Sequence, residues 1–232
     1  MGYTPYQVNC DDWVTVLSTL TLVVNLLTRT NCTFICMNFL AHAYLSFENP
    51  QILVGNMISD FVKGAKKNDF EKDIRQGILL HREIDSYTDL HPETKKAMQF
   101  FRPLYRLYSG PIIDIIFDHY LAVELDRTNT GSLKAFTTKV YQTLEDHRDS
   151  LPADFSSLLY YMKRDDWLYG YRFKEGIKRS LAGLARRARY LGDSEPAYLL
   201  FNEHYDALGE HFSAFFPDVK HYAKQRFGQM VF

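Results

Sequence analysis

The stretch from His81 to His119 gathers most of the side chains that could perform chemistry. It reads HREIDSYTDLHP from residue 81 and, after Pro111, IIDIIFDHYLA. Three histidines and four aspartates fall within these 39 residues, many of them inside apolar patterns. Ionisable groups are seldom buried unless they are paired or bind a metal. The stretch therefore predicts a metal site built between two core helices.

Helical geometry turns the first part of this stretch inward. Successive residues of an α-helix are about 100° apart around its axis. His81 and Asp85 therefore continue the apolar stripe that Ile74 and Ile78 begin, and Asp89 lies just beside it. We expect His81 and Asp85 to face the protein interior.

The second part predicts a central helix. Asp114 and Asp118 share one face with Leu121, and isoleucines and a phenylalanine occupy most of the remaining surface. A helix that is apolar nearly all round is buried, and two carboxylates on it need a cation. Imidazole and carboxylate groups suit Mn²⁺, Mg²⁺ or Fe²⁺, whereas the absence of cysteine from residue 37 onward argues against structural zinc. Such an ion would favour hydrolysis of a phosphate ester. The candidate side chains are His42, Asp60, His81, Asp85, Asp114, Asp118 and His119.

Simpler interpretations of the same residues stay open. His81 and Asp85 could form an ordinary ion pair one helical turn apart. Asp118 could pair with Arg82 or Arg106. Beyond these, His42 could be an ordinary core histidine, and Asp89 and Asp114 could be ligands or lie just outside the ligand set.

Composition limits the class of protein. The chain has 232 residues, a net charge of −1 and 46% hydrophobic residues, which is typical of a globular protein and argues against general nucleic-acid binding. Its cysteines, Cys10, Cys32 and Cys36, all precede Met37. A disulfide framework is therefore not expected in the main body, and we expect a cytoplasmic protein.

Residues 1–36 differ from the remainder and carry only three charged side chains. The apolar run from Trp13 to Leu27 is shorter than the ~20 residues that a membrane span needs. The leading charges are acidic, unlike those of a secretory signal. A start codon assigned too early, an additional helix and a membrane tether are the three interpretations. We assign no function to residues 1–36 and expect no membrane span.

Helical periodicity and breaking residues predict an all-α domain over residues 37–232. No run of alternating β-branched residues is long enough for a central strand. Proline at 103 should kink one helix and proline at 217 should interrupt the last. The expected helices cover residues 37–47, 51–63, 70–90, 93–108, 111–128, 132–147, 154–169, 175–190 and 197–227.

Several motifs in order make this domain resemble the acyl carrier protein phosphodiesterases. They are MNFLAHAYLS from Met37, GNMISDFVKG from Gly55, GILLHREIDSYTDLHP from Gly77 and DIIFDHYLA from Asp114. The resemblance covers essentially all residues from Met37. It implies a single all-α domain related to the HD-type metal phosphohydrolases, with residues 1–36 as an extension outside the family domain. The order Asp118-His119 departs from the His-Asp order of ordinary HD enzymes.

The resemblance also implies an activity and residue roles. Holo-acyl carrier protein would be hydrolysed with Mn²⁺ to apo-protein and 4′-phosphopantetheine. Asp60 matches the family's essential aspartate, as a further ligand or as the base for the attacking water. His119 would bind the metal or hydrogen-bond the phosphodiester. The metal would be held by His42, His81, Asp85 and Asp118.

An acidic carrier protein predicts a basic surface on its enzyme. Residues 171–190 contain seven basic side chains against one acid, Glu175. We expect the carrier to bind at Arg179, Arg186, Arg187 and Arg189.

Two other functions compete with this one. The first is an HD-like phosphohydrolase that acts on a nucleotide or a small phosphoester. The second is a carrier-binding module without catalytic activity.

Overall fold

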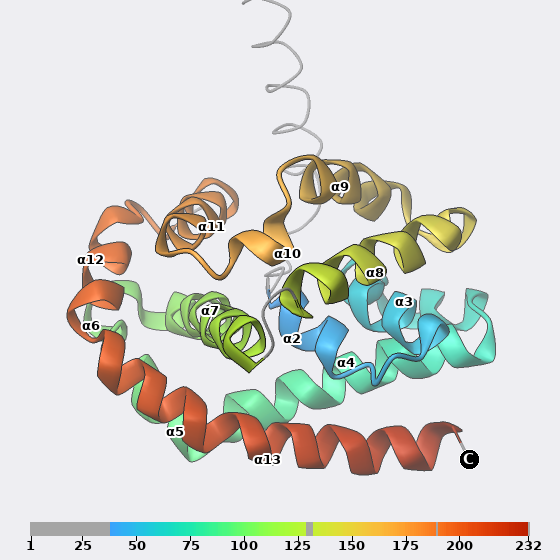
Figure 1. Ribbon diagram of the computed structural model, residues 1–232, viewed down its shortest axis with the longest axis horizontal. Helices are drawn as coiled ribbons and strands as arrows, with labels where there is room; N and C mark the ends of the chain where they lie inside the picture. Colours follow the sequence, from blue (N-terminus) through green and yellow to red (C-terminus); the bar gives the residue numbers. More distant parts are fainter. Residues whose placement is uncertain (1–37, 129–131, 189, 232) are drawn as a thin grey trace, which may run out of the picture. The chain divides into compact units, whose positions relative to one another are not determined.

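The computed structural model describes residues 38–128, 132–188 and 190–231, and these residues form an all-α domain without a strand (Figure 1). The all-α prediction is confirmed. The expectations for residues 1–36 lie outside the described residues. Within the described ranges, no helix combines the length and the apolar character that a membrane crossing requires.

Over the described ranges the helices follow one another closely, with four short 3₁₀ helices, labelled η, between them. The elements are α2 (Phe39–Tyr44), α3 (Pro50–Ile58), η1 (Ser59–Phe61), η2 (Gly64–Asp69), α4 (Lys72–Leu90), α5 (Pro92–Met98), α6 (Arg102–Tyr105), η3 (Arg106–Tyr108), α7 (Ser109–Thr128), α8 (Ser132–Asp146), η4 (Arg148–Ser150), α9 (Ala153–Arg164), α10 (Trp167–Gly170), α11 (Lys174–Arg187), α12 (Glu195–Glu203) and α13 (Tyr205–Val231).

Helix α7 is the central helix that the sequence predicts. Every residue from Ser109 to Ala122 is buried. Pro111 lies in the first turn of α7, where its missing N–H removes no helical hydrogen bond. Helices α2, α8 and α11 all pack against α7, so side chains of α7 reach the interior between them.

Helices α3 and α4 cross at two glycines. A Cβ atom added to Gly55 would lie 1.9 Å from the carbonyl oxygen of Ile74 and 2.9 Å from Gly77 Cα. A Cβ atom added to Gly77 would lie 2.3 Å from the carbonyl oxygen of Ile52. Only residues without a side chain allow two backbones to come this close. The crossing therefore fixes α3 and α4 relative to each other along their lengths.

The inward face of α4 also matches the prediction. Ile74, Ile78 and His81 are buried along one stripe. The helix ends at Leu90, and His91 is both its C-cap and the N-cap of α5. Since Pro92 disfavours helical backbone at the residue before it, the boundary is where the sequence places it.

The prediction that Pro217 interrupts the last helix was wrong. Helix α13 runs unbroken from Tyr205 to Val231 with Pro217 inside it (Figure 1). An internal proline costs about 3 kcal/mol of helix stability. The neighbouring Phe215, Phe216 and Val219 are buried, so packing of this turn offsets the loss.

Other helices break where the periodicity gave no sign, and the expected 197–227 segment is divided at His204, between α12 and α13. The helix expected over 154–169 is divided into α9 and α10 at Asp166, whose backbone is left-handed with φ 48° and ψ 52°. The helix expected over 93–108 ends at Met98, five residues before Pro103. Aspartate tolerates the left-handed region better than most residues, which makes the first break a local property of Asp166.

The glycine crossing gives a stability prediction. Gly55→Ala should lower the free energy of unfolding by about 1–3 kcal/mol or more, because its Cβ would overlap the α4 backbone. Urea denaturation followed by circular dichroism measures this change. Gly228→Ala in α13 is the matched control, because no atom lies within 4 Å of the added Cβ. Equal stability of the two variants would contradict the tight crossing.

Candidate metal centre

The Asp118 carboxylate of α7 holds the first turn of α2. Asn38, which precedes α2, makes no capping hydrogen bond with its side chain. Instead, the backbone N–H groups of Leu40 and Ala41 donate to the two oxygens of Asp118 at 2.9 and 2.8 Å. These N–H groups have no partner inside the helix. Asp118 thus fixes the helix that carries His42.

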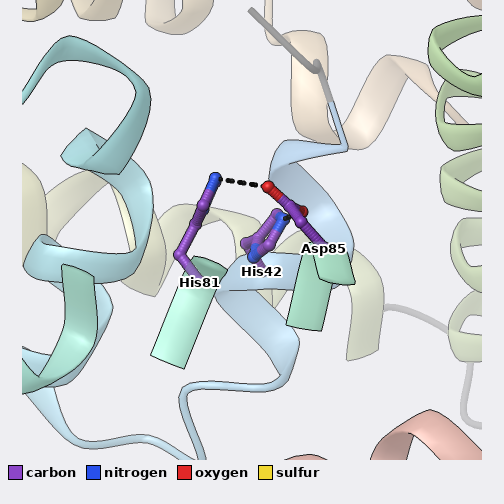
Figure 2. Close-up of side chains that lie close together, drawn as sticks. All are labelled: His42, His81 and Asp85. Atoms are coloured by element: carbon purple, nitrogen blue, oxygen red, sulfur yellow. Dashed lines mark hydrogen bonds and ion pairs between the residues drawn. The ribbon is translucent and has the colours of Figure 1, made fainter. Parts of the chain in front are cut away.

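Three side chains converge between α2 and α4 (Figure 2). His42 Nε2 lies 3.1 Å from Asp85 Oδ1, and His81 Nε2 lies 3.1 Å from Asp85 Oδ2. The two imidazole rings stack with centroids 3.9 Å apart. One ligand atom from each residue lies within 4.8 Å of the others. The structure brings together three of the side chains that the sequence predicts.

Asp60 borders this cluster from η1. Its Oδ1 lies 3.3 Å from His81 Nε2, and its side chain keeps 16% of its surface exposed. Asp60 Oδ2 is buried and makes no hydrogen bond within the described part of the chain, whereas His81 Nε2 faces the Asp60 and Asp85 carboxylates. Buried polar atoms without a partner are rare in folded proteins, and a bound ion is one of the groups that can satisfy them.

Electrostatics ties the cluster together. Burial would lower the pKa of His81, but the carboxylates of Asp85 and Asp60 outweigh it and raise this pKa to about 10. Burial and the neighbouring His81 ring lower the pKa of His42. Burial would raise the pKa of Asp85, but the two imidazoles hold it well below its ordinary value. The carboxylates therefore attract positive charge to this point.

The donor set fits a divalent cation. The ligand atoms of His42, His81 and Asp85 are close enough to one another to bind a single ion. Asp60 supplies an oxygen next to them. Nitrogen and oxygen donors without sulfur are typical of Mn²⁺, Fe²⁺ and related ions. The described residues thus include a candidate His-His-Asp metal site.

Asn56 is a site residue that the sequence analysis missed. It is fully buried on α3, with its Oδ1 2.7 Å from His42 Nδ1 and its carbonyl oxygen 2.8 Å from His81 Nδ1. An asparagine inside the apolar run around Met57 was the available signal, because a buried amide needs hydrogen-bond partners. Asn56 contacts both histidines of the cluster.

The placement of Asp118 does not support the expected ligand role. Both of its oxygens accept backbone hydrogen bonds from α2, and the converging group does not include it. Burial raises the pKa of Asp118, while these two N–H donors act in the opposite direction. The structure shows neither of the alternative ion pairs of Asp118, with Arg82 or with Arg106, among the described residues, and the Arg82 guanidinium donates to the carbonyl oxygen of Val62.

His119 is held on another side of α7. Its Nδ1 lies 2.7 Å from the carbonyl oxygen of Tyr171, and its Nε2 lies 2.9 Å from the hydroxyl of Tyr205. Burial, together with the ammonium of Lys174, lowers its pKa. Since both ring nitrogens are engaged, this placement supports a structural tie and gives no support to the expected catalytic role.

Asp89 and Asp114 lie outside the converging group. Asp89 is exposed one turn beyond Asp85, and desolvation together with the Asp85 carboxylate raises its pKa. Asp114 is buried and lines a small cavity with Asn38 and Thr88. Neither residue is placed as a ligand of the three-residue cluster.

Comparison with known proteins agrees with the motifs. The family profile described as acyl carrier protein phosphodiesterase matches residues 37–219. The chain belongs to this family. The acyl carrier protein phosphodiesterases of Photorhabdus laumondii and of Enterobacter sp. are each 32% identical over 191 residues, which cover 82% of this chain and 96% and 99% of theirs. That of Yersinia pestis is 31% identical over 191 residues, or 82% of this chain and 99% of its own.

No solved structure matches the chain significantly. The relation of this phosphodiesterase family to HD-type hydrolases therefore stays a prediction. The membership itself agrees with the order of the four motifs, which the structure places on α2, α3 with η1, α4 and α7.

The arginines of α11 differ in exposure. Arg179 and Arg186 are exposed and line a hollow of about 630 Å³ beside Trp167. Arg187 is only partly exposed, and desolvation lowers its pKa to about 10. Arg189 lies outside the described residues. Of the four predicted partner-binding arginines, two therefore face this hollow.

Capping by Asp118 gives a second prediction. Asp118→Asn should lower the free energy of unfolding by about 1–3 kcal/mol. The substitution replaces one carboxylate oxygen by an NH₂ group, which cannot accept a hydrogen bond from the α2 backbone N–H that it faces. Chemical denaturation measures the change. Glu124→Gln, at an exposed position of the same helix, should change stability by less than about 0.5 kcal/mol. Similar losses in both variants would argue against the cap.

Proposed function

We propose that this chain hydrolyses the phosphodiester that links 4′-phosphopantetheine to a serine of holo-acyl carrier protein. The products are the apo-protein and 4′-phosphopantetheine. The observation that carries the proposal is the convergence of His42, His81 and Asp85, with Asp60 beside them, in a chain of this family. The catalytic domain is residues 37–232, and the proposed location is the cytoplasm.

The proposed ligands are His42, His81 and Asp85, with Asp60 as a fourth ligand or as the base. Mn²⁺ is the proposed ion, and Mg²⁺ and Fe²⁺ are the alternatives that this donor set allows. When bound, such an ion acidifies water and neutralises negative charge on a phosphoryl oxygen.

The chain's own residues orient the reaction. Asp60 is the proposed proton acceptor for the attacking water, because its Oδ2 has no hydrogen-bond partner among the described residues, whereas both oxygens of Asp85 face the imidazoles. The water attacks phosphorus, the bond from phosphorus to the serine oxygen breaks, and the serine oxygen takes up a proton. Asp118 acts through α2 by holding His42 in place.

The acidic carrier protein is proposed to dock at Arg179 and Arg186. These arginines are seven residues apart on α11 and therefore lie on nearly the same helix face. Other basic side chains of this segment already have partners: Arg172 pairs with Asp126, and Lys178 pairs with Glu195. Two exposed guanidinium groups beside a hollow would steer an acidic partner and mainly raise the association rate.

A different observation would favour a rival function. Release of inorganic phosphate or a nucleoside from small substrates would indicate a general phosphohydrolase. Carrier binding without metal and without turnover would indicate a binding module. Intact-mass measurement of holo-acyl carrier protein, incubated with the enzyme and either Mn²⁺ or EDTA, separates these functions from the proposed one.

The cluster gives a prediction for catalysis. Asp85→Asn and Asp60→Asn should each weaken Mn²⁺ binding and reduce turnover by about a hundredfold or more, because each removes an anionic donor. Titration calorimetry measures binding, and loss of the prosthetic-group mass measures turnover.

Asp73→Asn is the matched control, since Asp73 is a partly exposed residue in the first turn of the helix that carries Asp85 and lies outside the converging group. It should keep wild-type affinity and turnover. Wild-type activity in Asp85→Asn would remove that residue from the proposed ligand set.

Docking gives a prediction for kinetics. The double charge reversal Arg179→Glu with Arg186→Glu should raise KM about tenfold or more at low salt, with kcat nearly unchanged, and should flatten the salt dependence of kcat/KM. Steady-state kinetics with holo-acyl carrier protein checks this result. The control reverses two exposed cations on other helices, Arg127→Glu with Lys224→Glu. Equal KM changes in both double variants would place docking elsewhere.

A further inference from the structure

Asn56 joins the two histidines of the cluster through different atoms. Its side-chain Oδ1 faces His42 Nδ1 at 2.7 Å, whereas its main-chain oxygen faces His81 Nδ1 at 2.8 Å. Its Nδ2 donates to the carbonyl oxygen of His42 at 2.9 Å and to Ser46 Oγ at 3.1 Å. Every polar side-chain atom of this buried amide is therefore in use.

The orientation of the amide follows from these contacts. A carbonyl oxygen can only accept, so the Asn56 atom that faces the carbonyl of His42 is the NH₂ group. The opposite atom, which faces His42 Nδ1, is then the oxygen. Because this oxygen and the main-chain oxygen accept only, both histidines carry a proton on Nδ1.

Once a cation takes the place of any proton on Nε2, a proton on Nδ1 leaves Nε2 as the coordinating atom of each imidazole. Both Nε2 atoms point at Asp85, and His81 Nε2 also approaches Asp60. In the opposite tautomer the lone pair would lie on Nδ1 and would face an oxygen of Asn56 instead of the cluster.

We propose that Asn56 is the positioning residue that fixes the Nδ1–H form and the ring orientation of both histidines, so that their Nε2 atoms face a shared cation. The part of this inference that concerns a shared cation rests on the proposed function. The orientation itself rests on the contacts of Asn56.

Substitution separates the two contacts. Asn56→Leu removes the acceptor of His42 and keeps the main-chain acceptor of His81, which makes His81 an internal control. Asn56→Asp keeps an oxygen opposite His42 Nδ1. Ser46→Ala is the matched control, since it removes the hydroxyl that contacts Asn56 Nδ2 and the His42 carbonyl oxygen and leaves Asn56 Oδ1 opposite His42 Nδ1.

The first measurement is histidine ¹⁵N NMR of the full-length, metal-free chain, at a pH above the ordinary histidine pKa of about 6.5. The wild-type protein, Ser46→Ala and Asn56→Asp should show a protonated Nδ1 on His42. In Asn56→Leu this proton should move to Nε2, while His81 keeps its Nδ1 proton. An unchanged Nδ1 proton on His42 in Asn56→Leu, or its loss in Asn56→Asp, would overturn the proposal.

The second measurement is Mn²⁺ affinity, from the electron paramagnetic resonance signal of the free ion. Asn56→Leu should weaken binding about tenfold to a hundredfold, and Ser46→Ala should change it by less than about threefold. Equal affinities of Asn56→Leu and wild type would overturn the positioning role. A wild-type protein that binds no Mn²⁺ but shows the expected NMR shifts would refute the proposed function and still support the orientation by Asn56.

Discussion

The close crossing of α3 and α4 is the constraint on which the site depends. At Gly55 and Gly77 the two backbones approach to a distance that no side chain would allow. The residue after Gly55 is Asn56, whose main-chain oxygen then reaches His81 Nδ1 on α4, 2.8 Å away. A wider crossing would break that hydrogen bond. Asn56 would then support His42 but no longer His81. The glycines therefore contribute to the orientation of the His81 imidazole by allowing Asn56 to reach it.

The same geometry concentrates negative charge around the imidazoles. Asp85 faces both Nε2 atoms and Asp60 faces one of them, in a place where the histidines are almost completely buried. A mostly buried carboxylate is stable only when positive charge or hydrogen-bond donors surround it. Without a metal, protonation of His81 supplies that charge, which is why its pKa is raised to about 10. A divalent cation would meet the same requirement with the Nε2 lone pairs as ligands.

The sequence was sufficient for the helices and for part of the site, because both depend on local spacing. The stripe of Ile74, Ile78 and His81 and the apolar surface of α7 follow from helical angles, and both are buried as expected. The role of Asn56 depends on which helix lies across from α3, and spacing along one helix contains no such information. The unbroken α13 has the same cause, since the packing around Pro217 comes from residues distant in sequence.

Asp118 shows that backbone N–H groups can supply hydrogen bonds to a buried acid without a metal. Helical angles predicted correctly that it faces inward, and the electrostatic rule that it needs a compensating partner also holds. The partner is a pair of backbone N–H groups at the start of α2, which provide hydrogen bonds without a cation. No sequence pattern distinguishes these two solutions, because the donors belong to a segment almost 80 residues earlier in the chain. The carboxylate still serves the site, since it anchors α2 and thereby places His42 against His81, the contact from which the cluster is built.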